Sequence, residues 1–208
     1  HTGCDNAQEQ GQRLNASKSY IKHVSSSDIL TAVNKGNFIA TEDFSRLVQM
    51  DVIIICVPTP LAPNREPDLQ FVISTAKAIA KHLRPGKLIV LESTTYPGTT
   101  NEIVTPILEA GGLVSGQDFF LAYSPEREDP GNVDFKTRSI PKVLGGDGAE
   151  ACDLTNELYG EVISETVPVS NMDTAEAAKL TENIFRAVNI LIVKELKLIY
   201  TELGVDIW

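Results

Sequence analysis

Residues 51–57, DVIIICV, form a short and almost continuous apolar run, and an amphipathic segment, LQFVISTAKAIAKHL, follows after a proline-rich turn. The same alternation recurs at KLIVLES (87–93), which precedes TTNEIVTPILEAG, and again at DFFLAYS (118–124). Apolar strands that alternate with helices are typical of a parallel sheet covered on both faces. We therefore predict an α/β fold with a doubly wound parallel sheet, to which further segments add two strands and a helix: PKVLGG, VISETVPV and EACDLTNELYG.

Composition limits the classes of function. The chain has 208 residues, of which 42% are hydrophobic, and a formal net charge of -10. An acidic chain without a Lys/Arg cluster is a poor partner for nucleic acid or an anionic membrane, so we expect a small-molecule substrate. The cysteines Cys4, Cys56 and Cys152 form no CxxC pair, and no zinc site is expected. Without a signal peptide or an apolar run of about 18 residues, the sequence favours a cytoplasmic protein.

A long helix is predicted to begin in SNMDTAEAAK (170–179). Asp173 is the expected N-cap, Glu176 has the capping-box spacing, and Gly204 would end the helix after about Leu203. A helix with apolar residues on two sides is usually buried between two bodies. We expect a linker helix that packs on the sheet domain and on a second domain or subunit, and therefore a homodimer or, if the second apolar side stays uncovered, an aggregation-prone monomer. Its two stripes are Phe185, Val188, Ile192, Leu196 and Ile199, and Leu180, Ile184, Ala187, Leu191 and Leu198.

The first residues, HTGCDNAQEQGQRLN, are typical of a strand that ends and leads into a helix, with Asp5 at the strand end. In dinucleotide-binding folds, an acidic residue there follows a G-x-G-x-x-G turn by about 20 residues and binds the adenosine ribose. No such turn occurs in the sequence. Two interpretations stay open: the turn lay upstream, or Asp5 is an ordinary surface residue. Under the first interpretation, the predicted sheet is Rossmann-like but lacks its first strand and glycine turn.

Ligands of open parallel sheets bind beyond the carboxyl ends of the strands. Three predicted strands end there in polar or proline-rich turns: CVPTPLAPN, ESTTYPGTT and YSPEREDPGN. In these turns, Thr94 either holds a water or ligand oxygen or caps the following turn. Glu126 is either a general base or part of a solvated charge cluster.

Lys179 and Asn183 lie one turn apart on the predicted long helix. This spacing places an ammonium and a carboxamide on one helical face, where both could act on one small group. The alternative is a solvated helix edge.

The motifs GCD, ICVPTPL, ESTTYPGTT, YSPEREDPGN and AEAAKLTENIFRAVNI, followed by ELGVDIW, span nearly the whole chain. In this order they resemble the UDP-glucose/GDP-mannose dehydrogenase family, and most of all its UDP-N-acetylglucosamine 6-dehydrogenase branch. The resemblance implies oxidation of C6 of a nucleotide sugar from alcohol to carboxylate, with two NAD molecules and a cysteine that holds the intermediate.

The resemblance also implies roles for single residues. Lys179 and Asn183 would stabilise negative charge on the reacting oxygen, Thr94 would help hold a water near C6, and Glu126 would act as acid or base. Asp5 would bind the adenosine ribose. The rest of the cofactor site would be lined by Val57, Pro58, Thr59, Ser93 and Thr94.

The sequence departs from the family in two places. It has no glycine-rich phosphate turn before Asp5 and no counterpart of the nucleophilic cysteine that follows GVDIW in the family. Cys152 and Cys56 are expected to be buried structural thiols. We thus expect an incomplete NAD-binding domain at 1–170 and a linker or dimerisation helix at 171–208. We further expect that the nucleotide-sugar domain is absent from these 208 residues and that the chain alone is catalytically incomplete.

Two alternatives remain. The chain could be a non-catalytic truncated paralogue that acts as a dimerisation or regulatory partner. It could also be a relative of the 3-hydroxyacid and 6-phosphogluconate dehydrogenases, which also set Lys and Asn one turn apart, but TAEAAK lacks the glycine-rich segment that usually precedes their Lys.

Overall fold

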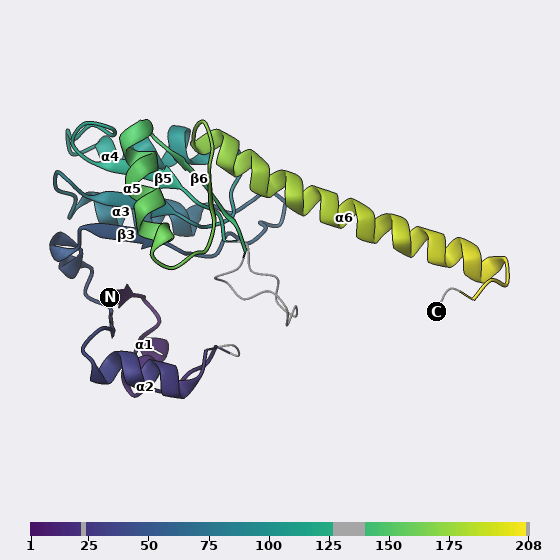
Figure 1. Ribbon diagram of the computed structural model, residues 1–208, viewed down its shortest axis with the longest axis horizontal. Helices are drawn as coiled ribbons and strands as arrows, with labels where there is room; N and C mark the ends of the chain where they lie inside the picture. The colour runs from purple at the N-terminus through teal and green to yellow at the C-terminus, as the bar shows by residue number, and fades with distance from the viewer. Residues whose placement is uncertain (22–23, 127–139, 207–208) are drawn as a thin grey trace. The chain divides into compact units, whose positions relative to one another are not determined.

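The computed structural model describes residues 1–21, 24–126 and 140–206 (Figure 1). The chain divides into two compact units, His1–Gln49 and Met50–Trp208, which we call unit 1 and unit 2. Each unit is described by itself below.

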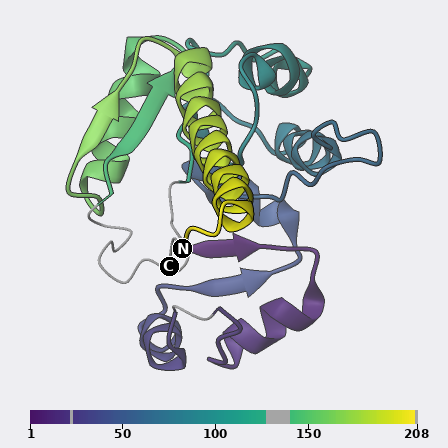
Figure 2. The same ribbon diagram turned by 90° about the vertical axis from the view of Figure 1, so that its right-hand side faces the viewer.

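Unit 1 is built around two parallel strands, β1 (Thr2–Cys4) and β2 (Ile39–Thr41), seen side by side in Figure 2. The strand predicted at the start of the chain is therefore present, and it leads into helix α1 (Gln8–Asn15). The Asn15 side chain bonds both the N–H and the C=O of Ala40, at 2.8 Å each, and so ties α1 to β2. The remaining helical segments are α2 (Ser26–Asn34) and the 3-10 turn η1 (Phe44–Gln49).

Unit 2 contains a five-stranded sheet in the order β3-β4-β5-β6-β7. The pairs β3–β4, β4–β5 and β6–β7 are parallel, whereas β5 and β6 are antiparallel. The predicted α/β class is confirmed, but its sheet is not wholly parallel. The strands are β3 (Val52–Ile55), β4 (Leu88–Leu91), β5 (Phe120–Tyr123), β6 (Lys142–Gly146) and β7 (Thr166–Pro168).

The burial patterns of β3 and β4 agree with their places in the sheet. All four residues of β4 are buried, as expected for a strand with a neighbour on each side and cover on both faces. The strand β3 alternates instead: Ile53 and Ile55 are buried, while Val52 and Ile54 are partly exposed. This alternation agrees with the place of β3 at one end of the five-stranded sheet.

Helices pack on this sheet as the amphipathic segments predict. Helix α5 (Ala149–Gly160) contacts β4, β5 and β6, and its Tyr159 joins a core cluster with Leu88, Val90, Ala122 and Leu144. A second group of helical segments contacts one another. This group consists of α3 (Gln70–Ala80), the π-helical turn η2 (Thr99–Val104) and α4 (Thr105–Glu109).

The direction of β6 decides what reaches the edge of the sheet where β3, β4 and β5 end. Because β6 runs antiparallel to β5, its first residue, Lys142, lies at that edge instead of the opposite one. This placement brings a cation to the carboxyl ends of the parallel strands.

The long helix α6 spans Met172–Glu202, and Gly204 follows it with φ +70°, which confirms the predicted C-terminal end. The predicted capping box is wrong. Asn171 is the N-cap and accepts from the Thr174 N–H at 2.8 Å, while the Asp173 carboxylate accepts from the Asn101 side chain at 2.7 Å. Glu176 is fully buried and bonds a different segment.

Only the first turns of α6 are buried, at Met172, Ala175 and Glu176. Further along, large apolar side chains are exposed, for example Phe185 at 72% and Leu198 at 63%. Figure 1 shows α6 continuing beyond the sheet of unit 2. The expected packing on the sheet domain thus holds for the start of the helix, and both apolar stripes are uncovered over most of its length.

Candidate functional site

The loops after β3 and β4 are joined at the carboxyl edge of the sheet. The Ser93 hydroxyl donates to the Val57 carbonyl at 2.7 Å, and the Thr59 hydroxyl donates to the Thr94 carbonyl at 2.8 Å. Both hydroxyls therefore shape the loops, whereas Pro58 and the Thr94 side chain are exposed. The structure thus brings Val57, Pro58, Thr59, Ser93 and Thr94 together in one place, as the sequence predicts.

Glu126 follows β5 at the same edge, and α6 reaches it through Lys179. The Lys179 ammonium donates to the Glu126 carbonyl at 2.5 Å, and the Glu126 N–H donates to the Glu92 carbonyl at 3.4 Å. Lys179 is half-buried, and the Glu126 side chain is 48% exposed. Asn183 lies one turn beyond Lys179 and is exposed. Two predicted catalytic residues from distant segments are therefore neighbours.

Glu176 is fully buried on α6 and holds the loop that follows β4. Its carboxylate accepts from the N–H groups of Gly98 and Thr100, at 2.8 and 3.0 Å, and from the hydroxyls of Thr95 and Thr100. Burial raises the pKa of the Glu176 carboxyl, although these hydrogen bonds lower it in part. The N-terminal amides of η2 thus already bind an internal carboxylate. Sequence reasoning missed this contact because it assigned Glu176 to a capping box.

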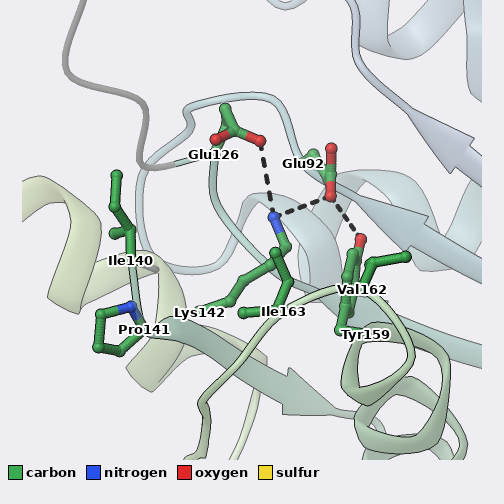
Figure 3. Close-up of a pocket in the computed structure, with 8 residues that line it drawn as sticks. All are labelled: Glu92, Glu126, Ile140, Pro141, Lys142, Tyr159, Val162 and Ile163. Atoms are coloured by element: carbon green, nitrogen blue, oxygen red, sulfur yellow. Dashed lines mark hydrogen bonds and ion pairs between the residues drawn. The ribbon is translucent and has the colours of Figure 1, made fainter. Parts of the chain in front are cut away.

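A cluster of charged and polar side chains lies beside Glu126 (Figure 3). The Lys142 ammonium lies 2.9 Å from Glu92 Oε1, and the Tyr159 hydroxyl donates to the same oxygen at 2.5 Å. Burial and the Glu92 charge raise the pKa of Tyr159 above its usual range. A cavity of about 170 Å³ opens here, with Ile140, Pro141, Val162 and Ile163 among its lining residues.

The three cysteines are free thiols. Cys56 is exposed, so the prediction that it is buried is wrong. Cys152 is half-buried in α5. The Cys56 thiol donates to Glu92 Oε2 at 3.2 Å. Although residue Cys56 as a whole is exposed, its thiol is partly desolvated; this desolvation, followed by the Glu92 charge and this hydrogen bond, raises the pKa of Cys56 to about 12. A thiol in this setting is a poor nucleophile at neutral pH.

This pKa predicts slow alkylation of Cys56. At pH 8, a thiol of pKa about 12 has roughly 1000-fold less thiolate than one of pKa 9, so iodoacetamide should label Cys56 far more slowly than free cysteine. The rate should rise with pH through pH 10. Glu92→Gln removes the negative charge and should speed the reaction. Peptide mass spectrometry over time measures the rate, and labelling as fast as that of free cysteine would contradict the expected pKa.

Asp5 belongs to unit 1, where it follows β1. Its backbone N–H donates to the Thr41 carbonyl at 3.1 Å, and its Oδ1 accepts from the Ala7 N–H at 2.9 Å. This turn fixes the direction of an exposed carboxylate at a strand end, where a ribose hydroxyl can donate to it. Asp5 therefore offers the acceptor that the adenosine end of a dinucleotide would need.

A mainly parallel α/β sheet with polar loops at its carboxyl edge, as in unit 2, is typical of dinucleotide-binding proteins, and so is an acidic residue that follows a strand, as in unit 1. Residues 1–163 match the NAD binding domain of the UDP-glucose/GDP-mannose dehydrogenase family, and residues 173–208 match its central domain. The chain belongs to this family, which confirms the resemblance seen in the sequence and NAD as its cofactor.

Individual relatives agree with this assignment. The chain is 39% identical over 168 residues to UDP-N-acetyl-D-glucosamine 6-dehydrogenase of Pseudomonas aeruginosa, covering 80% of this chain and 40% of that protein. It is 33% identical to UDP-N-acetyl-D-mannosamine dehydrogenase of Escherichia coli K12, covering 99% and 50%. The solved structure of UDP-D-ManNAc dehydrogenase from Pyrococcus horikoshii aligns with a TM-score of 0.93 and 31% identity, covering 99% and 49%.

The chain therefore spans half or less of the length of these relatives. In the part of the chain that the structure describes, none of the helices has the length and apolar character needed to span a bilayer.

Proposed function

We propose that this chain supplies the NAD-binding part and the linker helix of a nucleotide-sugar 6-dehydrogenase. The enzyme would oxidise C6 of a UDP-sugar, UDP-N-acetylglucosamine or a similar one, to the uronic acid. The observation that carries the proposal is the contact of Lys179 with Glu126, which joins two candidate catalytic residues beside the loops after β3 and β4. We assign 1–170 to the NAD-binding domain and 171–208 to the linker helix.

The roles follow from charge and position. Lys179 and Asn183 would donate to the reacting oxygen as it gains negative charge. Glu126, with half of its side chain exposed, would accept or return a proton, and Thr94 would hold a water near C6.

NAD would accept the hydride from C6. Asp5 would bind its adenosine ribose, and five residues of the joined loops would line the rest of the site. The Ser93 and Thr59 hydroxyls contribute through the shape of the loops, since they donate to backbone carbonyls. Those five residues are Val57, Pro58, Thr59, Ser93 and Thr94.

The second oxidation in the proposed reaction needs a nucleophilic thiol. The pKa of Cys56 is about 12, and burial also raises the pKa of Cys152 and of Cys4, so none of the three thiols suits this role at neutral pH. We therefore propose that the 208 residues alone are catalytically incomplete. A non-catalytic role as a dimerisation or regulatory partner is the second candidate, supported by the uncovered apolar residues of α6.

NADH formation tests the function. NAD is supplied with UDP-N-acetylglucosamine, UDP-N-acetylmannosamine or UDP-glucose, and NAD binding is measured by calorimetry in parallel. We expect turnover when the chain is joined to the family's nucleotide-sugar domain and none from the 208 residues alone. Turnover by the 208 residues would overturn the proposed incompleteness. Absence of turnover and of NAD binding in the joined protein would favour the partner role.

Lys179→Ala should lower kcat in the active protein by about 100-fold or more, because the reacting oxygen loses a positively charged donor. Lys194→Ala is the matched control on the same helix, at an exposed position, and should leave kcat unchanged. Steady-state NADH kinetics give both values. Equal kcat in Lys179→Ala and the unsubstituted protein would remove Lys179 from the catalytic residues.

The partner we propose for α6 is a second copy of this chain. Its exposed apolar side chains include Ile184, Phe185, Leu191, Val193 and Leu198, each more than half exposed. An apolar surface of this kind marks a protein contact or a tendency to aggregate.

Sedimentation velocity at increasing concentration should therefore show a dimer, and Phe185→Ser should shift the equilibrium toward monomer. A monomer at high concentration in the unsubstituted chain would contradict the homodimer.

We also propose the cytoplasm as the compartment. The three free thiols support this location because a reducing compartment keeps cysteines unpaired.

A further inference from the structure

Lys142 is buried, and a lysine is almost never buried unless its charge is paired. It begins β6, its side chain is 8% exposed, and its ammonium lies 2.9 Å from Glu92 Oε1. The same ammonium lies 4.7 Å from the centre of the Tyr159 ring, within cation–π distance. Two elements besides β6, the loop after β4 and helix α5, therefore fix the position of this cation.

Glu92 is itself held from both sides. Tyr159 donates to its Oε1 at 2.5 Å, and the Cys56 thiol donates to its Oε2 at 3.2 Å. The Glu92 side chain is only 12% exposed. A carboxylate with a hydrogen bond on each oxygen is a rigid anchor, so the Lys142 ammonium has little freedom to move.

The anchored ammonium reaches Glu126 and the residue before it. It lies 3.7 Å from Glu126 Oε2, an ion-pair distance, and 3.5 Å from the Pro125 carbonyl. The strand register explains this proximity: Ala122 pairs with Gly146 and Tyr123 with Gly145, and the same antiparallel register, continued along the chain, sets Glu126 opposite Lys142. Opposite charges in such a pair attract each other.

We propose that Lys142 is a positioning residue that holds the Glu126 carboxylate at the carboxyl edge of the sheet. The proposal rests on the proposed function, which gives Glu126 its acid or base role. Lys179 fixes the Glu126 carbonyl and Lys142 its carboxylate, so the two lysines act on different ends of one residue. Within residues 1–21, 24–126 and 140–206, the charged groups named at Glu126 are Lys142 of β6, Glu92 of the loop after β4, and Lys179 of α6, whose ammonium contacts the carbonyl.

The competing explanation is that Lys142 only neutralises the buried Glu92. The two explanations differ in one respect: positioning requires that Lys142 responds to a change at Glu126. Glu126→Gln is a suitable probe because the Glu126 side chain is half exposed and the buried Lys142 ammonium keeps its ion pair with Glu92 in the variant.

The test is an NMR experiment on the chain labelled with [13Cε]lysine, with the Lys142 signal assigned by Lys142→Arg. We expect Glu126→Gln to shift this signal by more than its line width, and the control Glu150→Gln, at an exposed position of α5, to leave it in place. A Lys142 signal that moves in Glu92→Gln but stays in place in Glu126→Gln would overturn the proposal.

Turnover in the active protein separates this inference from the function on which it rests. Lys142→Met should lower kcat by about tenfold or more, a part of the roughly 10²–10⁴-fold contribution of a positioned acid or base. Lys142→Arg should restore most of it, and the KM for NAD should stay constant. An NMR shift in Glu126→Gln with unchanged kcat would retain the Lys142–Glu126 contact and remove the acid or base role of Glu126.

Discussion

Glu176→Ala is expected to lower the free energy of unfolding by about 4 kcal/mol, because it removes the acceptor of two buried backbone N–H groups and two hydroxyls. The hydroxyls of Thr95 and Thr100 can turn to other acceptors, whereas the N–H groups of Gly98 and Thr100 are fixed by the backbone. For a chain of this length, the melting temperature should fall by roughly 8–16 °C. Thermal and urea unfolding followed by circular dichroism measure the loss.

Glu195→Ala is the matched control because it makes the same change on the same helix at an exposed position. Its effect should stay within about 0.5 kcal/mol. Glu176→Gln adds a second comparison: it keeps the size of the side chain but turns an NH2 group toward the donors, so it should also destabilise strongly. If Glu176→Ala unfolds at the same temperature as Glu195→Ala, the hydrogen bonds to the η2 loop contribute nothing measurable.

The larger elements could be predicted because they depend on local patterns. The strands β3, β4 and β5 lie inside the predicted apolar runs, and α6 ends where Gly204 permits a left-handed residue. The start of α6 could not be predicted as well. Asn171 and Asp173 are both good N-caps, and Glu176 three residues after Asp173 mimics a capping box. In the structure, the Asp173 carboxylate accepts a hydrogen bond from Asn101, a residue far away in sequence. No local sequence pattern predicts such a contact.

The residues of the candidate site also fall into those that the sequence predicts and those that it does not. Lys179, Asn183, Glu126 and Thr94 could be singled out because they lie at predicted strand ends or on one helical face. Lys142 could not, because its role depends on the direction of β6. In a wholly parallel sheet, the first residue of a strand lies at the edge opposite to the ligand. The connection between β5 and β6 is long enough for either direction, so the sequence does not decide between them.

Gly145→Ala is expected to have a comparably large effect, because a Cβ atom at this position would lie 2.2 Å from the Asn171 carbonyl oxygen and 2.6 Å from its carbon. Both contacts are with backbone at the start of α6, which cannot turn away as a side chain can. Gly146 faces the other side of the sheet, where a Cβ atom would lie 2.3 Å from the Cys152 N of α5. The two glycines thus let one helix approach β6 closely on each face.

The cost of Gly145→Ala should be about 3 kcal/mol or more, with a fall in melting temperature of roughly 6–12 °C. Gly160→Ala is the control, since nothing lies within 4 Å of a Cβ atom at this helical position, and it should be neutral or slightly stabilising. Because α6 carries Lys179, displacement of its start should also weaken the Lys179 contact with the Glu126 carbonyl. In the active protein, kcat should therefore be lower even at temperatures well below the melting temperature of the variant, where the variant is still folded. Unchanged stability would mean that α6 can move away from β6 without loss, and unchanged kcat would mean that Lys179 does not depend on this packing.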